Sequence, residues 1–228
     1  MNTPRISQHR SRFVAAVAGL LLAVAGGNAV AQEEPIDIIN SAVDALKTGL
    51  QGQRETLAED RAALIRFVDG LLAPRFDRNY AGRLVLARHW RGATTEQKKR
   101  FIDGLYNSLI RRYADGVLEF QEDRVEVLAP RAGDNDEKRA TVRTVVTLDG
   151  GESVPVNYGL VNRGDNGWKV FDVTIEGISY VRNFRAEIDE EVKRTSLDAV
   201  ITRLETEAAD ALGGVDESEV SAETAAGS

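Results

Sequence analysis

Three ionisable side chains lie close together near the end of the globular part of the sequence: Asp172, Glu176 and Tyr180. They lie at or near the Glu176–Gly177 break in an apolar run, where a buried carboxyl group can act as an acid or base on a small carbonyl substrate. The spacing is not diagnostic, because acidic residues at strand ends commonly form solvated edges and turns. The structural interpretation is therefore favoured over a catalytic one.

This chain has few residues suited to other kinds of catalysis or to metal binding. Cysteine is absent, which excludes thiolate catalysis, zinc–thiolate sites and disulfides. Of the two histidines, His9 lies in the N-terminal segment, so only His89 remains as a base for a Ser-His-Asp relay. No loop of closely spaced acids resembles an EF-hand. We expect no catalytic residue, no metal and no cofactor.

Apolar residues offer a different kind of site. A stripe at steps of four runs along one expected helix: Phe101, Leu105, Leu109, Tyr113 and Val117. Expected strands supply a facing apolar surface, and two such surfaces usually close on each other to make a core. The alternative is that they are held apart around an apolar ligand. Arg182 and Arg185 would then lie where an anionic headgroup emerges, since the planar guanidinium fork suits phosphate; ordinary surface charge is the competing interpretation.

Periodicity predicts the elements that position these residues. Helical spacing of apolar residues is found at 35–50, 54–72, 80–90, 94–117 and 184–212. Thr94 and Gln97 have the spacing of a capping box. Alternating spacing predicts four strands, at 124–128, 140–148, 154–160 and 168–178. Short turns between the strands indicate an antiparallel meander, and the fold class is α+β.

The two ends of the chain differ from its middle. Residues 1–31 combine a basic start, a short apolar stretch and an Ala-Val-Ala exit, which predicts a cleavable secretory signal with cleavage near Ala31; an uncleaved membrane anchor is the alternative. Residues 32–212 are predicted to form a single domain, and 213–228 a disordered acidic tail. Signal removal takes away three arginines and no acid, so the net charge falls from −7 to about −10. Such an acidic chain is a poor nucleic-acid binder.

Two runs resemble the signatures of a known family. YAGRLVLARHWRGATTEQKKRF (80–101) and GWKVFDVTIEGISYVRNFR (167–185) are similar to the two motifs of the MlaC family of periplasmic phospholipid-binding proteins, also called toluene-tolerance proteins. The resemblance covers roughly 36–212. Two departures are small: Ala87 stands where the family usually has Gly, and Phe184 replaces a common Tyr.

The resemblance implies helices packed over a curved four-stranded antiparallel sheet, related to cystatin-like and nuclear-transport-factor-like architectures. It implies an apolar pocket between the layers that takes the acyl tails and leaves the headgroup at the mouth. It also implies a monomeric, non-enzymatic periplasmic shuttle. Such a protein would carry glycerophospholipid between an outer-membrane lipoprotein–porin complex and the lipid-binding ring of an inner-membrane ABC transporter, which maintains outer-membrane lipid asymmetry.

We expect the pocket to draw on both layers. Its predicted lipid-binding residues are Tyr80, Leu86, Phe101, Leu105, Leu109, Tyr113, Val142, Val156, Tyr158, Val170, Ile175, Ile178 and Val181, with Arg182 and Arg185 at the headgroup. One alternative is a small-molecule enzyme of similar fold that uses Asp172 or Glu176 as acid or base. Another is a non-catalytic interaction module with a solid core.

Overall fold

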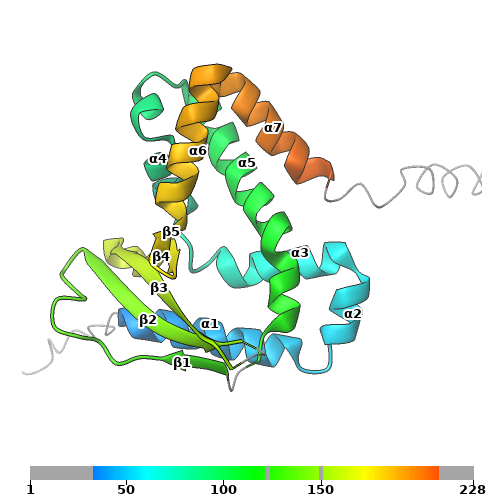
Figure 1. The fold of residues 1–228 in the computed structure, drawn as a ribbon, viewed down its shortest axis with the longest axis vertical. Helices are drawn as coiled ribbons and strands as arrows, with labels where there is room; N and C mark the ends of the chain where they lie inside the picture. Colours follow the sequence, from blue (N-terminus) through cyan, green and yellow to red (C-terminus); the bar gives the residue numbers. More distant parts are fainter. Residues whose placement is uncertain (1–32, 122–123, 149–150, 211–228) are drawn as a thin grey trace, which may run out of the picture. The chain divides into compact units, whose positions relative to one another are not determined.

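The computed structural model describes residues 33–121, 124–148 and 151–210, and it is an α+β structure (Figure 1). The predicted signal peptide and acidic tail lie outside the described residues. The helices are α1 (Pro35–Leu50), α2 (Arg54–Glu59), α3 (Arg61–Leu72), α4 (Arg78–Leu86), α5 (Thr95–Tyr113), α6 (Tyr180–Arg194) and α7 (Leu197–Asp210), with 3-10 turns η1 (Ala87–Arg91), η2 (Ala114–Glu119) and η4 (Gly164–Asn166). The strands are β1 (Val125–Val127), β2 (Arg139–Thr147), β3 (Ser153–Asn162), β4 (Trp168–Ile175) and β5 (Ile178–Ser179).

The sheet is an antiparallel meander in the order β1-β2-β3-β4-β5. The four predicted strands are present, but the prediction of one last strand over 168–178 was wrong. The chain turns back at Glu176 and Gly177, whose φ angles are 51° and 82°. Positive φ at both central residues is the requirement of a type I′ turn, which matches the twist of the two flanking strands. Ile178 therefore pairs with Ile175 as a fifth strand.

Helix boundaries follow local capping. The Thr94 hydroxyl accepts a hydrogen bond from the Gln97 amide, and the Gln97 side chain accepts one from the Thr94 amide, so the predicted capping box is confirmed. The helix expected over 54–72 is instead two helices, because Asp60 leaves helical conformation and caps α3 by accepting from the Ala63 amide. A side-chain cap in mid-run competes with continuation of the helix.

The end of α4 carries backbone strain. Ala87, the residue that follows α4, has φ 44° and ψ −112°. A Cβ disfavours positive φ, whereas glycine adopts it freely. The glycine that the family motif usually places here is thus explained by backbone conformation, and alanine at this position stores strain.

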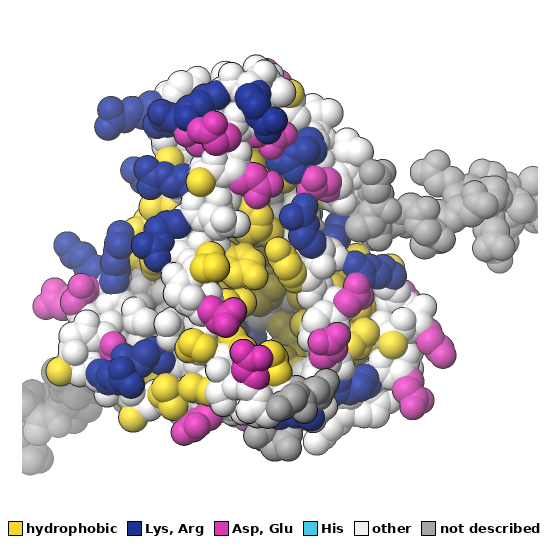
Figure 2. All heavy atoms as spheres, viewed as in Figure 1, with side chains coloured by type: hydrophobic (Ala, Val, Ile, Leu, Met, Phe, Trp, Pro, Cys, Tyr) yellow, Lys and Arg dark blue, Asp and Glu magenta, His cyan; other side chains and the backbone are white. Residues whose placement is uncertain are grey.

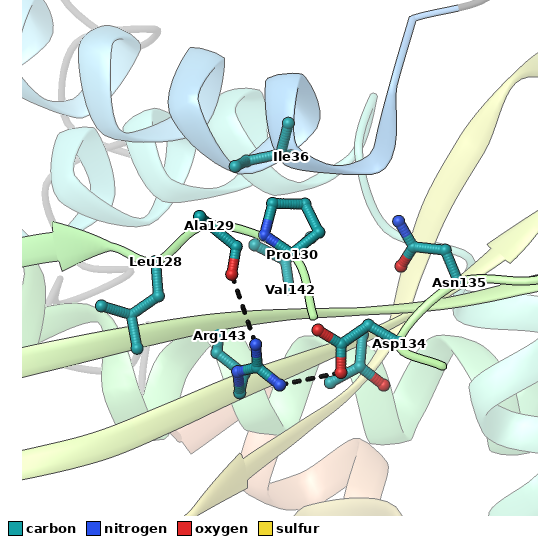
Figure 3. A pocket seen from close by; sticks show the side chains of 9 residues that line it. Ile36, Leu128, Ala129, Pro130, Asp134, Asn135, Val142 and Arg143 are labelled. Atoms are coloured by element: carbon teal, nitrogen blue, oxygen red, sulfur yellow. Dashed lines mark hydrogen bonds and ion pairs between the residues drawn. The ribbon is translucent and has the colours of Figure 1, made fainter. Parts of the chain in front are cut away.

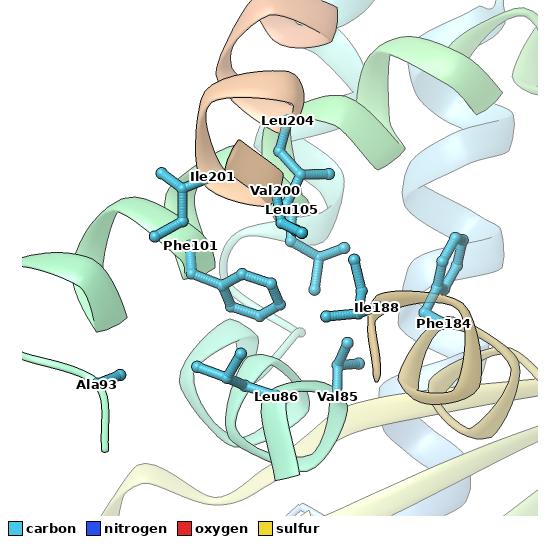
Figure 4. Close-up of a cluster of buried hydrophobic side chains, with 10 residues drawn as sticks. All are labelled: Val85, Leu86, Ala93, Phe101, Leu105, Phe184, Ile188, Val200, Ile201 and Leu204. Carbon is cyan, nitrogen blue, oxygen red and sulfur yellow. The ribbon is translucent and has the colours of Figure 1, made fainter. Parts of the chain in front are cut away.

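Buried side chains form three separate hydrophobic clusters. The helical cluster joins α4, α5, α6 and α7 (Figure 4) and contains Val85, Leu86, Ala93, Phe101, Leu105, Phe184, Ile188, Val200, Ile201 and Leu204. The sheet cluster places α1 on the sheet through Ile38, Ile39, Ala140, Val142, Leu160, Trp168 and Val170. The lower helical cluster contains Leu50, Leu57, Leu64, Val68, Tyr106, Ile110 and Ala114.

The long helix α5 packs mainly against other helices. Its main partners are α7, α4 and α3, whereas α1, α4 and α6 pack on the sheet. Close approach of α5 to α7 depends on Gly104, because a Cβ there would lie 3.2 Å from the Cβ of Leu204. Because its main partners are helices, α5 does not pack against the sheet along its length. Among the described helices, none is both long and apolar enough to cross a membrane.

Candidate functional site

A hollow lined by hydrophobic side chains opens between α5 and the sheet (Figure 2). Large apolar residues at the end of α5 and on β5 remain accessible: Tyr113 is 48% exposed and Ile178 is 61% exposed. Tyr113 meets Tyr180, the first residue of α6, edge-to-face with ring centroids 6.0 Å apart, and Tyr180 in turn contacts Phe184. Exposed apolar side chains grouped in this way mark a binding surface rather than a finished core.

Strand register continues the apolar surface across the sheet. Val156 of β3 pairs with Ile175 of β4, and Ile175 pairs with Ile178 of β5, so all three side chains lie on one face. The next row on that face contains Val142 and Tyr158. Burial raises the pKa of the Tyr158 phenol, which keeps this hydroxyl neutral within the apolar face. The cross-strand rows offer hydrocarbon contacts and no charge.

The two candidate acids have different structural surroundings. Asp172 is used as a cap: its carboxylate accepts hydrogen bonds from the Ser179 hydroxyl at 2.6 Å and from the Val181 amide at 3.0 Å. Ser179, which is buried, also caps α6 by accepting from the Arg182 amide. Glu176 is exposed at the β4–β5 turn. This arrangement fixes the start of α6 beside the hollow, and it gives Asp172 a structural role.

The predicted helical residues fall into two groups. Leu86 and Phe101 have no exposed area, and Leu105 is almost as buried, in the interior of the helical cluster. Leu109 and Val181 are partly buried against that cluster, as is Tyr180, which was a candidate acid–base group. Leu109, Tyr180 and Val181 therefore pack against the same cluster, and the Tyr180 ring also contacts the exposed Tyr113.

The predicted sheet residues also separate. Val142 and Val170 are buried under α1, with Tyr158 partly buried against the same cluster. Val156 is 8% exposed, and Ile175 is partly buried in the row that leads to Ile178. The structure therefore brings Val156, Ile175 and Ile178 together, and it places Val142 and Val170 in the sheet cluster.

Tyr80 and the two predicted headgroup arginines have other environments. The Tyr80 ring meets Phe171 at 5.1 Å, its hydroxyl accepts a hydrogen bond from Arg139, and the Arg163 guanidinium lies 4.7 Å from its ring centroid. Tyr80 thus belongs to a cation–π cluster between α4 and the sheet. Arg182 and Arg185 are exposed on the first turns of α6.

Two pockets elsewhere in the described residues are small or polar. A cavity of about 10 Å³ lies between Ile36 of α1 and Val142 of β2, beside an Arg143–Asp134 ion pair at 2.8 Å (Figure 3). That volume holds at most one water molecule. A second cavity, of about 210 Å³, lies between α3 and α5 and is lined largely by polar side chains. Of these three concavities, the apolar hollow best suits a hydrocarbon ligand.

Sequence comparisons relate this chain to known proteins. The sequence model of the MlaC protein family matches residues 40–206. The toluene tolerance protein Ttg2D of Pseudomonas putida is 29% identical over 170 residues, which are 74% of this chain and 78% of that protein. The intermembrane phospholipid transport system binding protein MlaC of Haemophilus influenzae is 21% identical over 183 residues, covering 79% of this chain and 85% of that protein.

A solved structure shows the same fold. The phospholipid-binding protein of Ralstonia solanacearum, determined in complex with a phospholipid, superimposes with a TM-score of 0.69 at 24% identity. The match covers 79% of this chain and 99% of that structure. Since the family model spans most of the sequence, and the fold agrees, the chain belongs to the MlaC family.

Proposed function

We propose that this chain is a non-enzymatic periplasmic carrier that binds glycerophospholipid and shuttles it between the two membranes. Its acyl chains lie in the hollow between α5 and the sheet. The docking partners are an outer-membrane lipoprotein–porin complex and an inner-membrane ABC transporter, and the exchange maintains outer-membrane lipid asymmetry. The names of the Haemophilus and Ralstonia relatives, which specify phospholipid transport and binding, support this proposal.

The observation that carries the proposal is the accessible apolar surface formed by Tyr113, Ile178 and their neighbours. Exposed aromatic and aliphatic side chains around a hollow are suited to covering hydrocarbon, a task that needs no acid. In this proposal the sheet contributes Val156, Ile175 and Ile178, while α5 and α6 contribute Leu109, Tyr113, Tyr180 and Val181.

The energetics explain why a carrier must enclose most of its cargo. Each methylene group removed from water contributes about 0.8 kcal/mol, so two acyl chains of about 15 methylenes each represent on the order of 24 kcal/mol. This stabilisation is non-directional and depends on apolar area alone. We therefore expect the space between α5 and the sheet to widen around the ligand, since the helical cluster and the sheet cluster have separate buried interiors.

Native mass spectrometry of freshly purified protein tests the proposal. The wild type should carry an added mass equal to that of a phospholipid. Ile178→Glu places a charge on a side chain that is 61% exposed, so it should leave the fold intact and strip the lipid. Leu109→Glu should have the same effect on lipid at the α5 side. The matched control is Leu72→Glu, a 41% exposed leucine at the end of α3, which should retain the lipid mass.

The catalytic alternative predicts a different pattern. An enzyme that used Asp172 or Glu176 would lose turnover of its substrate on amide substitution at both positions while lipid retention stayed normal. No adduct on the wild type, or equal lipid retention by Ile178→Glu, Leu109→Glu and wild type, would contradict the proposed site.

A further inference from the structure

The second cavity is a cationic pocket on the helical part of the molecule. It has a volume of about 210 Å³, well above the roughly 10–15 Å³ that a single water molecule needs. Its lining consists of Ile65, Arg66 and Asp69 from α3, Arg78 from α4, and Tyr106, Asn107, Ile110 and Arg111 from α5. Three arginines and one aspartate give this pocket a formal net charge of +2.

Arg111 is the unusual member of the set. Its Nε and Nη1 atoms are buried and have no hydrogen-bond partner among the described residues. Desolvation, together with the nearby positive charge of Arg61, lowers the pKa of the Arg111 guanidinium. Buried guanidinium nitrogens without an acceptor are costly, because each has lost water and gained nothing in return. An anion that enters the cavity would supply the missing negative charge.

The other polar groups leave room for such an anion. Asp69, the one acid in the lining, accepts a hydrogen bond from the Tyr106 hydroxyl at 2.9 Å. Arg78 lies over the Tyr106 ring, 5.5 Å from its centroid, with its guanidinium held at the cavity. Arg66 contacts Asp60 only at 3.9 Å, a distance typical of a loose surface pair. The pocket therefore combines two exposed arginines and the partly buried Arg111 with one acid whose carboxylate already has a donor.

We propose that this cationic pocket between α3 and α5 binds a phosphate-class oxyanion, held by Arg66, Arg78 and Arg111. Guanidinium groups bind phosphate through paired, charge-assisted hydrogen bonds, and the excess positive charge of the pocket suits an anion. The site is lined by residues other than those of the apolar hollow, so it does not depend on the proposed lipid function. Its ligand can be free phosphate or the phosphate of a lipid headgroup.

Isothermal titration of inorganic phosphate into the full chain, at constant ionic strength, tests the site. The wild type should bind saturably, and Arg111→Gln should weaken the affinity by about tenfold, which corresponds to about 1.4 kcal/mol. Because Gln removes an uncompensated charge, we expect Arg111→Gln to melt no lower than the wild type without phosphate. Arg78→Gln, on an exposed side chain, gives a second variant with the same expected loss. Arg194→Gln, an exposed arginine at the end of α6, is the control and should bind as wild type does.

A lipid arm distinguishes the two sources of phosphate. If the ligand is a headgroup, Arg111→Gln also loses co-purified phospholipid and a short-chain phosphatidylglycerol competes with inorganic phosphate. If the ligand is free phosphate, lipid content is unchanged and no competition occurs. Ile178→Glu should bind phosphate normally, so failure of the lipid proposal leaves this test intact. Unsaturable binding by the wild type, or equal affinity in wild type, Arg111→Gln and Arg78→Gln, would overturn the proposal.

Discussion

The cap that Asp172 provides at the start of α6 can be tested by removing its carboxylate. In Asp172→Ala the Ser179 hydroxyl and the Val181 amide lose their acceptor. Ser179 is only 4% exposed, so water cannot easily replace the lost group. The first turn of α6, which begins with Tyr180, should therefore fray, and its contact with Tyr113 beside the hollow should loosen.

The magnitude follows from the two hydrogen bonds. Hydrogen bonds to a charged acceptor contribute about 1.5–3 kcal/mol each, and loss of a helix cap typically costs about 0.5–2 kcal/mol. We expect Asp172→Ala to lower the free energy of unfolding by about 2–4 kcal/mol. Asp172→Asn keeps one acceptor oxygen and should lose about half of that. At about 2–4 °C per kcal/mol for a domain of this size, the alanine variant should melt about 4–16 °C lower.

Urea unfolding followed by circular dichroism measures the effect, with native mass spectrometry of the same samples for lipid content. The predicted order of stability is wild type, then Asp172→Asn, then Asp172→Ala, with lipid retention falling in the same order. A catalytic base would show another pattern, because its removal commonly leaves stability unchanged or improved. Equal unfolding midpoints for all three proteins would refute the capping role and reopen the acid–base interpretation.

Three further predictions concern the helices. Phe101→Ala should cost about 3–5 kcal/mol of unfolding free energy in urea, since the ring has no exposed area. Ala87→Gly should stabilise by about 1 kcal/mol by relieving positive φ, raising the melting temperature, whereas Ala87→Val should lower it. The hydrogen bond from Arg88 holds the pKa of Asp189 well below its usual range. Asp189 thus stabilises the fold above the unfolded pKa of about 3.9, and the gap between wild type and Asp189→Asn in pH-dependent melting should shrink as pH falls below that value. A gap that is constant with pH, a stable Phe101→Ala, or a destabilised Ala87→Gly would each contradict its prediction.

Much of the fold could be predicted because local chemistry and periodicity agreed. The capping box at Thr94 and Gln97 and the polar turns at 131–138 and 162–167 act over a few residues, and the described residues have them where expected. The break at Asp60 was missed because apolar residues keep helical spacing on both sides of it. Only the side-chain cap, which competes with the backbone, decides that α3 begins anew there.

The site was less predictable than the fold. An apolar run through Ile178 and Tyr180 is consistent with a continuing strand or with a turn followed by a helix. The choice depends on Glu176 adopting positive φ and on Asp172 reaching Ser179, a contact across seven residues. The division of the core into three clusters, and the cationic pocket around Arg111, arise from packing between elements distant in sequence. Periodicity within one element contains no information on such packing.

The location of the acyl chains is the central claim, and photo-crosslinking tests it most directly. The purified protein is loaded with a phospholipid that carries a diazirine at the end of one acyl chain. After irradiation, the labelled residues are mapped by mass spectrometry of peptides. The account predicts label on the residues around the hollow: Leu109, Tyr113, Ile175, Ile178, Tyr180 and Val181. Label confined to the cationic pocket or to the outer surface of α7, with none between α5 and the sheet, would contradict it.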